Sequence, residues 1–330
     1  MELRINRKGL LFTFMAILIA GLLTTVYSTH QITPIDEDVS VEKARILSSN
    51  QRFKSVVTYA ETSLQIAGYR SLQEMIDYIH EEDTFYTKDE LNIIFSETIR
   101  NGTINGVERK NMRNLTVNEL MDDIVDLVMN ESRAIIQYNI TSITIDQIKP
   151  FAVTAKMNIT IVFIENQVGW NDSKEISSHI TIEGLKDPLY FSIGYNNSFK
   201  KSPTNYRKFN TTTFEKLVNN SEYLSSQSQI SIEDVGLFKP ISFFGRLTNN
   251  SNVKNDTSLT LLSVVNPERL TSPPTSVSYI DYMFHRDFNT TECQRYLRQV
   301  NNTVNKPPVD IEHLTLVFNI TTRNQEPAIC

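Results

Sequence analysis

The sequence predicts an α+β protein. It should have a single N-terminal transmembrane helix, a long amphipathic helix with short helices, and an ectodomain built on an antiparallel or mixed β-sheet. An uncharged apolar run near the N-terminus is long enough to cross a bilayer. Apolar residues then recur with a helical period, and from about residue 134 they alternate with polar ones, as in half-buried strands. We therefore divide the chain into residues 1–29 (cytoplasmic tip and membrane helix), residues 30–132 (helical segment) and residues 133–330 (α+β extracytoplasmic domain).

The apolar run covers residues 9–27 and directly follows Arg4, Arg7 and Lys8. Its length is close to the roughly 20 residues with which a helix spans the hydrocarbon core, so the lipid bilayer is its expected partner. Basic residues concentrate on the cytoplasmic side of membrane helices. The expected localisation is therefore the cell membrane, single-pass, with a cytoplasmic N-terminus and an extracellular C-terminal domain.

Three fates are open for this run. It could remain as a plain anchor. It could instead be a secretory signal, with Val26 and Ser28 at the small-residue positions of a cleavage site. The third fate is processing of the kind described next.

Arg7, Lys8 and Gly9 stand directly before the apolar run, and this string resembles the class III signal peptide of archaeal type IV pilin-like surface proteins. In that family a peptidase cuts after the small residue and leaves the apolar helix on the mature protein. The resemblance implies cleavage between Gly9 and Leu10, and other pilin-like subunits or surface proteins as partners. The chain departs from the common bacterial pattern at Phe14, where Glu is usual.

A second string carries the same resemblance. Residues 184–190 read Gly-Leu-Lys-Asp-Pro-Leu-Tyr, similar to a string in archaeal surface proteins with such N-termini. Its Asp-Pro pair also predicts a turn at the end of a strand.

An amphipathic helix is predicted after a polar stretch at residues 28–39, with Ser40 as its N-cap and an end near Ile79. Gly68 is a point where it could be interrupted. Its apolar residues recur at spacings of seven, four and three. This stripe consists of Ile46, Phe53, Val57, Ala60, Leu64 and Ala67.

Capping boxes announce three further helices, since a Thr hydroxyl can accept a backbone N–H while a Glu three residues later reaches back. The pairs are Thr87 with Glu90, Thr116 with Glu119, and Thr212 with Glu215. Two Asn-Gly pairs within residues 101–106 predict a turn between the first two helices.

Four strands are predicted from period-two alternation: residues 153–163, residues 176–182, residues 314–320, and a strand around Asn139. If the apolar face of each strand points inward, Asn139, Asn158 and Asn319 face solvent. Trp170 is expected in a hairpin loop, partly exposed.

Asn-x-Ser/Thr triplets are about three times as frequent as chance allows, which indicates N-glycosylation in an exported compartment. The fourteen acceptors are Asn101, Asn114, Asn130, Asn139, Asn158, Asn171, Asn196, Asn210, Asn219, Asn249, Asn255, Asn289, Asn301 and Asn319.

Composition and motifs argue against several function classes. A net charge of −6 disfavours nucleic-acid binding. The histidines lack metal-ligand spacing and no nucleophile elbow or phosphate loop occurs, so no catalytic, cofactor or metal residues are predicted. Cys293 and Cys330 either pair as a disulfide or remain free thiols.

The leading interpretation is a membrane-anchored, N-glycosylated, non-enzymatic cell-surface protein, as a minor or accessory pilin-like component. One alternative is a single-pass adhesin or ligand-sensing ectodomain. The other is an anchored extracellular hydrolase, which needs two carboxylates brought together from distant positions.

Overall fold

The computed structural model describes residues 7–165, 168–192, 196–202, 216–217, 219–225, 241–249, 259–263, 297–299 and 308–310, with the backbone only at residues 7–18, 20–38, 297–299 and 308–310. The elements in chain order are α1 (Arg7–Glu82), α2 (Lys88–Asn101), β1 (Thr103–Ile104), β2 (Val107–Glu108), η1 (Lys110–Met112), α3 (Val117–Ser132), β3 (Ile135–Lys149), β4 (Ala152–Glu165), β5 (Val168–Thr181), α4 (Pro188–Ser192), β6 (Tyr223–Ser225), β7 (Ile241–Ser242), α6 (Phe243–Leu247), β8 (Thr260–Ser263), β9 (Leu297–Gln299) and β10 (Pro308–Asp310).

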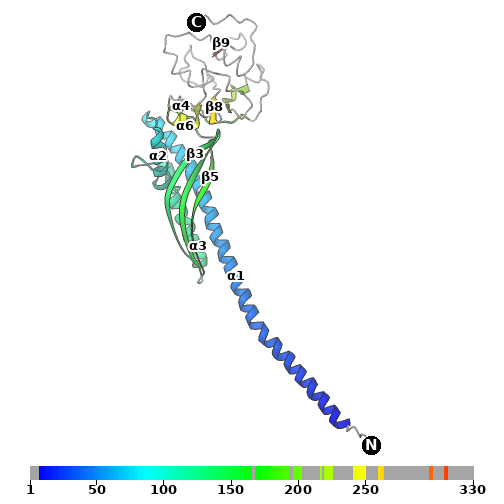
Figure 1. The fold of residues 1–330 in the computed structure, drawn as a ribbon. Helices are drawn as coiled ribbons and strands as arrows, with labels where there is room; N and C mark the ends of the chain where they lie inside the picture. The colour runs from blue at the N-terminus through cyan, green and yellow to red at the C-terminus, as the bar shows by residue number, and fades with distance from the viewer. Residues whose placement is uncertain are drawn as a thin grey trace.

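Helix α1 is one continuous helix of 76 residues, about 114 Å long at 1.5 Å per residue. Its C-terminal part packs against the other elements, whereas its N-terminal part extends far beyond them (Figure 1). The side chains of residues 39–48 are all exposed, and Ser49 is the first buried one after them. We call residues 7–48 the stalk. The head is the rest of α1 together with α2, α3 and strands β3 to β5.

The continuity of α1 corrects two sequence predictions. The helix does not begin at Ser40, because residues 28–39 are already helical. Pro34 removes one N–H donor and its ring crowds the carbonyl of His30, yet the helix is continuous through this position. Gly68 does not interrupt the helix either. A Cβ at Gly68 would lie 2.4 Å from Cδ1 of Ile180 on β5, so the glycine allows a close approach of helix and sheet.

The apolar stripe of α1 forms the centre of the core in the head. Phe53, Ala60, Leu64 and Ala67 are buried as predicted. Ile46 is 44% exposed, contrary to the prediction, because it lies in the stalk where no described element covers the helix.

The capping boxes at Thr87 and Thr116 are confirmed, with both reciprocal hydrogen bonds present in each. The predicted turn between the two helices is also confirmed, and it holds the short β1-β2 hairpin. Gly102 and Gly106 adopt positive φ angles there, which glycine tolerates best. The third capping box, at Thr212, lies outside the described residues.

Strands β3, β4 and β5 form a three-stranded antiparallel sheet in that order. The helices cover one face of it: α1 contacts β4 and β5, while α2 and α3 contact β3 (Figure 1). The predicted alternation is confirmed for residues 153–163 and 176–182, whose apolar residues are buried. A register shift between Ile140 and Ser142 interrupts the pairing of β3 with β4.

Trp170 lies within β5 rather than in a loop, and it is partly exposed as expected. Its ring stacks on Phe53 at 5.9 Å and meets Phe163 edge-on, so it joins the sheet to α1. The predicted strand at residues 314–320 lies outside the described residues.

A second, smaller unit follows the main sheet. Strands β6, β8 and β7 pair antiparallel in that order, and α4 and α6 pack together beside them. A hydrogen bond of 3.2 Å from the Tyr86 N–H to the Leu247 carbonyl, together with contacts between α1 and α4, joins this unit to the head. The described chain is therefore α+β with antiparallel sheets.

Among the residues whose side chains the structure describes, no helix is long and apolar enough to cross a membrane. The side chains of the expected membrane segment, residues 9–27, lie outside the described part except for Ile19, which is exposed.

Candidate functional site

The predicted glycan acceptors lie at the surface wherever the structure describes them. Eight are exposed and one, Asn249, is partly exposed. By contrast, Asn197, the middle residue of the Asn196 triplet and not itself an acceptor, is buried. The exposed acceptors are Asn101, Asn114, Asn130, Asn139, Asn158, Asn171, Asn196 and Asn219. Asn210, Asn255, Asn289, Asn301 and Asn319 lie outside the described residues.

Three of these acceptors share the face of the main sheet that the helices leave open. Asn139 pairs with Thr160 on β4, one row away from Asn158, while Asn171 pairs with Val162, one row further. Sheet spacings of 4.8 Å between strands and about 6.8 Å between rows place the three acceptors roughly 8 to 14 Å apart. Each strand therefore offers one acceptor to the same solvent-facing surface.

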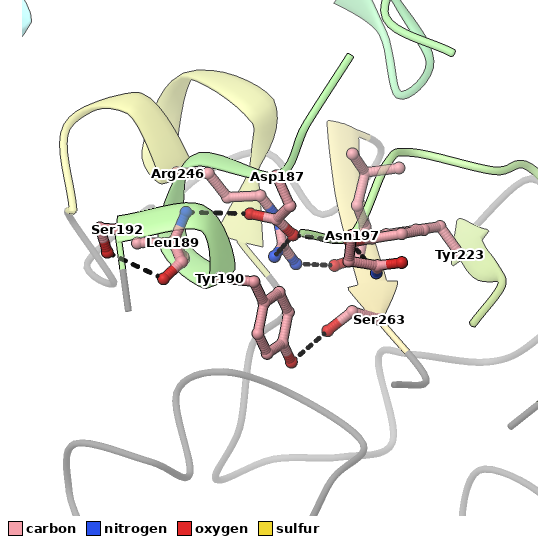
Figure 2. Close-up of polar contacts among 9 residues, drawn as sticks. Asp187, Leu189, Tyr190, Ser192, Asn197, Tyr223, Arg246 and Ser263 are labelled. Atoms are coloured by element: carbon pink, nitrogen blue, oxygen red, sulfur yellow. Dashed lines mark hydrogen bonds and ion pairs between the residues drawn. The ribbon is translucent and has the colours of Figure 1, made fainter. Parts of the chain in front are cut away.

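The string at residues 184–190 lies at the centre of a buried polar cluster in the smaller unit (Figure 2). The Asp187 carboxylate forms an ion pair with Arg246, with 2.7 Å between Oδ2 and Nη1, and both side chains are fully buried. The Tyr223 hydroxyl donates to the same Oδ2 at 2.9 Å, and the Leu189 N–H donates to Oδ1 at 3.1 Å.

Two further contacts extend this cluster. Asn197 donates from Nδ2 to the Tyr223 hydroxyl at 2.8 Å. Arg246 donates from Nη2 to the Leu261 carbonyl on β8 at 2.6 Å. The cluster thus joins the start of α4, the loop after it, β6, β8 and α6.

Burial dominates the electrostatics of this cluster. It raises the pKa of the Asp187 carboxyl, while the Arg246 guanidinium and the Tyr223 hydroxyl oppose the rise. Burial and the nearby carboxylate raise the pKa of Tyr223 well above its ordinary value, so its hydroxyl stays protonated and donates. Because neither charged group is open to solvent, the cluster holds segments together rather than offering a binding surface.

A second charged cluster fixes the loop after β2 onto α1. Arg109 binds Glu74 through Nε and Glu81 through Nη1, each at 2.8 Å. Its guanidinium also lies 5.8 Å from the centre of the Tyr78 ring. Burial raises the pKa of the neighbouring Asp77, and Lys186, at 3.9 Å, opposes that rise.

The described surface also has a groove of about 740 Å³ between α3 and β3. Within its lining, the Tyr138 hydroxyl joins β3 to α3 by hydrogen bonds to Oδ1 of Asp122 at 2.7 Å and to the carbonyl of Asn118 at 3.1 Å. Burial, with the Asp122 carboxylate adding to it, raises the pKa of Tyr138, so this hydroxyl stays protonated. The lining residues are Arg100, Asn118, Asp122, Val125, Ile136, Gln137, Tyr138, Asn139 and Ile140.

Gly9 and Leu10 lie in the helical backbone of α1, with side chains outside the described part. Cys293 and Cys330 lie outside it altogether. Within the described residues, no group of three His, Cys, Asp or Glu side chains could hold a metal ion.

Neither the buried cluster nor the groove can be predicted from the sequence. The Asp-Pro pair predicts only a turn, and nothing in the sequence links Asp187 to Arg246, 59 residues later. The groove likewise depends on how α3 packs beside β3, which no local pattern encodes.

The chain matches no known protein-family model, no curated protein and no solved structure.

Proposed function

We propose that the protein is a membrane-anchored, N-glycosylated, non-enzymatic cell-surface protein of the pilin-like type, in a minor or accessory role. Residues 9–27 would lie in the bilayer and the head would face outward. The observation that carries the proposal is the single helix from Arg7 to Glu82, which would join the membrane segment rigidly to the head.

Helix length supports this arrangement. The stalk of 42 residues is about 63 Å long, and roughly half of it would span the hydrocarbon core. Residues 28–48 would then hold the head about 30 Å from the membrane. A hinge between anchor and head would have argued for an independently tethered domain, and the described backbone contains no break there.

Exposed apolar side chains on the stalk support contacts with partner subunits. They are Val39, Val41, Ile46 and Leu47, each about half exposed. At about 100° per residue, Val39, Ile46 and Leu47 share one side of the helix, and exposed apolar patches often mark interaction sites. The exposed acceptors support the glycosylation part of the proposal, because a sugar can only be attached where the Asn side chain reaches solvent.

The second candidate is a single-pass adhesin or ligand-sensing ectodomain held by an uncut anchor. The groove between α3 and β3 favours it, because a binding protein needs such a concave surface. Within the described residues, no observation favours the hydrolase.

Mass spectrometry of the mature protein from its native membranes tests the proposal. A pilin-like protein should begin at Leu10 and carry sugars on exposed acceptors such as Asn158. An intact N-terminus would overturn the processing and leave the anchored adhesin. An end near Thr29 would mean a secreted protein, and unmodified acceptors would remove the glycoprotein assignment.

Photocrosslinking in native membranes tests the stalk contact separately. A photoreactive amino acid at Ile46 should crosslink to neighbouring subunits, whereas the same group at Thr62, exposed on the head portion of α1, serves as the matched control. Equal crosslinking at both positions would contradict a specific contact through the stalk.

A further inference from the structure

We infer that the open edge of strand β3 binds an extended acidic peptide segment of a partner protein, which adds to the main sheet as a fourth strand. The site is the groove between α3 and residues 136–140. The inference does not depend on whether residues 9–27 cross a membrane.

Backbone geometry shows which groups the edge offers. In an antiparallel sheet, the N–H and C=O groups of successive residues point alternately to the two sides of a strand. The Ile145 N–H donates to Asn92 on α2 at 2.8 Å, so Ile145 points its backbone groups away from β4. Its partner on β4 is Ala155, whose backbone groups therefore face β5.

The same alternation continues along β4, whose pairing with β5 is regular from Ala152 to Glu165. Odd-numbered residues of β4 thus face β5 throughout. Their partners on β3 beyond the register shift are Ile140, Tyr138 and Ile136, which must point their N–H and C=O groups to the open edge. Within the described part of the chain, no backbone group of another element bonds to them.

The two halves of this edge are treated differently. Near Ile145, α2 lies against β3 and the Asn92 side chain occupies an edge N–H. Along residues 136–140 no described element covers the edge in this way, and the groove lies beside it. Five residues of strand span about 17 Å, enough for a short extended segment. Open edges of this kind bind extended chains through main-chain hydrogen bonds.

The walls of the groove specify the chemistry of the segment. Val125 on α3 and the inward side chains of Ile136 and Ile140, each less than a tenth exposed, form the apolar part of the groove lining, which alternate residues of an added strand would cover. At the α2 end lies Arg100, whose Nε is buried and has no hydrogen-bond partner in the described chain. Asn118 donates from Nδ2 to the Arg100 carbonyl at 3.2 Å, which joins the end of α2 to the first turn of α3.

Arg100 forms no ion pair within the described chain, and the one carboxylate in the groove lining, Asp122, accepts from the Tyr138 hydroxyl. The guanidinium is therefore left to form a charge-assisted hydrogen bond with a carboxylate of the added segment. The expected segment therefore has apolar side chains at alternating positions and one Asp or Glu at the Arg100 end. Asn139 also lines the groove, although its side chain shares the solvent-facing side of the sheet with Asn158 and Asn171, away from the inward side chains of Ile136 and Ile140.

Hydrogen exchange of the full-length protein in detergent tests the edge itself. The amides of Ile136, Tyr138 and Ile140 should exchange fast, whereas those of Gln137 and Asn139, which face β4, should be protected. Protection of all five amides in dilute protein would mean that the edge is already covered and would overturn the inference. Protection that grows with protein concentration would assign the edge to a second copy, and would overturn it equally.

The binding step is tested with a randomised library of seven-residue peptides selected against the full-length protein. Selected peptides should share one acidic residue between alternating apolar ones, and they should protect the three edge amides. N-methylation of a peptide residue whose N–H faces β3 should abolish binding, and N-methylation of the residues between them should not. Arg100→Gln should weaken the binding of an acidic peptide about tenfold or more. A peptide in which Gln replaces the acidic residue should bind the Arg100→Gln variant as tightly as it binds the parent protein.

Two outcomes refute the peptide assignment. One is that the selected peptides show no preference for an acidic residue and that Arg100→Gln does not change their binding. The other is equal sensitivity to N-methylation at every position, which would exclude strand addition. Asp123→Asn, on an exposed residue of α3 outside the groove lining, is the control and should leave binding unchanged.

Discussion

Replacement of Arg246 by Met should destabilise the protein strongly at neutral pH and much less in acid. The change removes the ion pair of 2.7 Å to Asp187 and the hydrogen bond of 2.6 Å to the Leu261 carbonyl. It leaves a fully buried carboxylate whose remaining partners, among the described residues, are the Tyr223 hydroxyl and the Leu189 N–H. Removing one member of a buried pair typically costs about 3–5 kcal/mol, because the remaining charge is uncompensated.

The pH dependence follows from the direction of the pKa shift. Burial already raises the pKa of Asp187, and loss of the guanidinium removes the main opposing influence. A carboxyl with a raised folded-state pKa contributes stability that is present below its unfolded pKa, near 4, and lost as pH rises through its folded pKa. The penalty of Arg246→Met should therefore shrink by up to about 1.4 kcal/mol per pH unit as the carboxyl is protonated.

Chemical denaturation followed by circular dichroism at pH 7 and pH 5 measures this effect. Asp187→Asn combined with Arg246→Met should recover most of the lost stability, because no buried charge then remains. Lys174→Gln breaks a partly exposed ion pair of 3.1 Å and serves as the control, with an expected cost below about 1 kcal/mol. A penalty for Arg246→Met that is the same at both pH values would refute the reasoning.

Three further predictions concern the head. Thr87→Ala removes the cap of α2 and should lower the free energy of unfolding by about 1 kcal/mol; an unchanged denaturation midpoint would contradict this. Gly68→Ala gains helix propensity but forces Cδ1 of Ile180 to move, so it should be more favourable in an Ile180→Val background than in the parent protein; equal effects in the two backgrounds would contradict this contact. Asn92→Ala should speed hydrogen exchange of the Ile145 amide and cost about 1 kcal/mol, whereas unchanged exchange would mean that another group covers this amide.

Local signals in the sequence predicted the parts of the fold that local physics determines. The caps at Thr87 and Thr116 need only residues three positions apart, and the strands are marked by their own alternation. The stripe from Phe53 to Ala67 likewise follows from helical spacing alone. These features were predictable because each is decided within a few residues.

Other features depend on long-range packing and were not predictable. Ser40 has the chemistry of a cap, but the turns before it are helical, so no helix end exists for it to satisfy. Gly68 has low helix propensity, yet its role is set by Ile180, more than a hundred residues later. The groove was invisible for the same reason, since Arg100 and Tyr138 come together only through the packing of α2, α3 and β3.

The arrangement of acceptors limits where a partner could approach the head. The open face of the main sheet offers Asn139, Asn158 and Asn171 on three neighbouring strands, so sugars at these positions would cover much of it. The other face is already buried beneath α1, α2 and α3. Two described surfaces then remain on which a partner could bind. One is the edge of β3, with unpaired backbone groups, and the other is the stalk, with exposed apolar side chains. Because the two offer different chemistry, hydrogen-bonding groups on one and apolar contact on the other, they should bind different partners, and blocking one should leave the other functional.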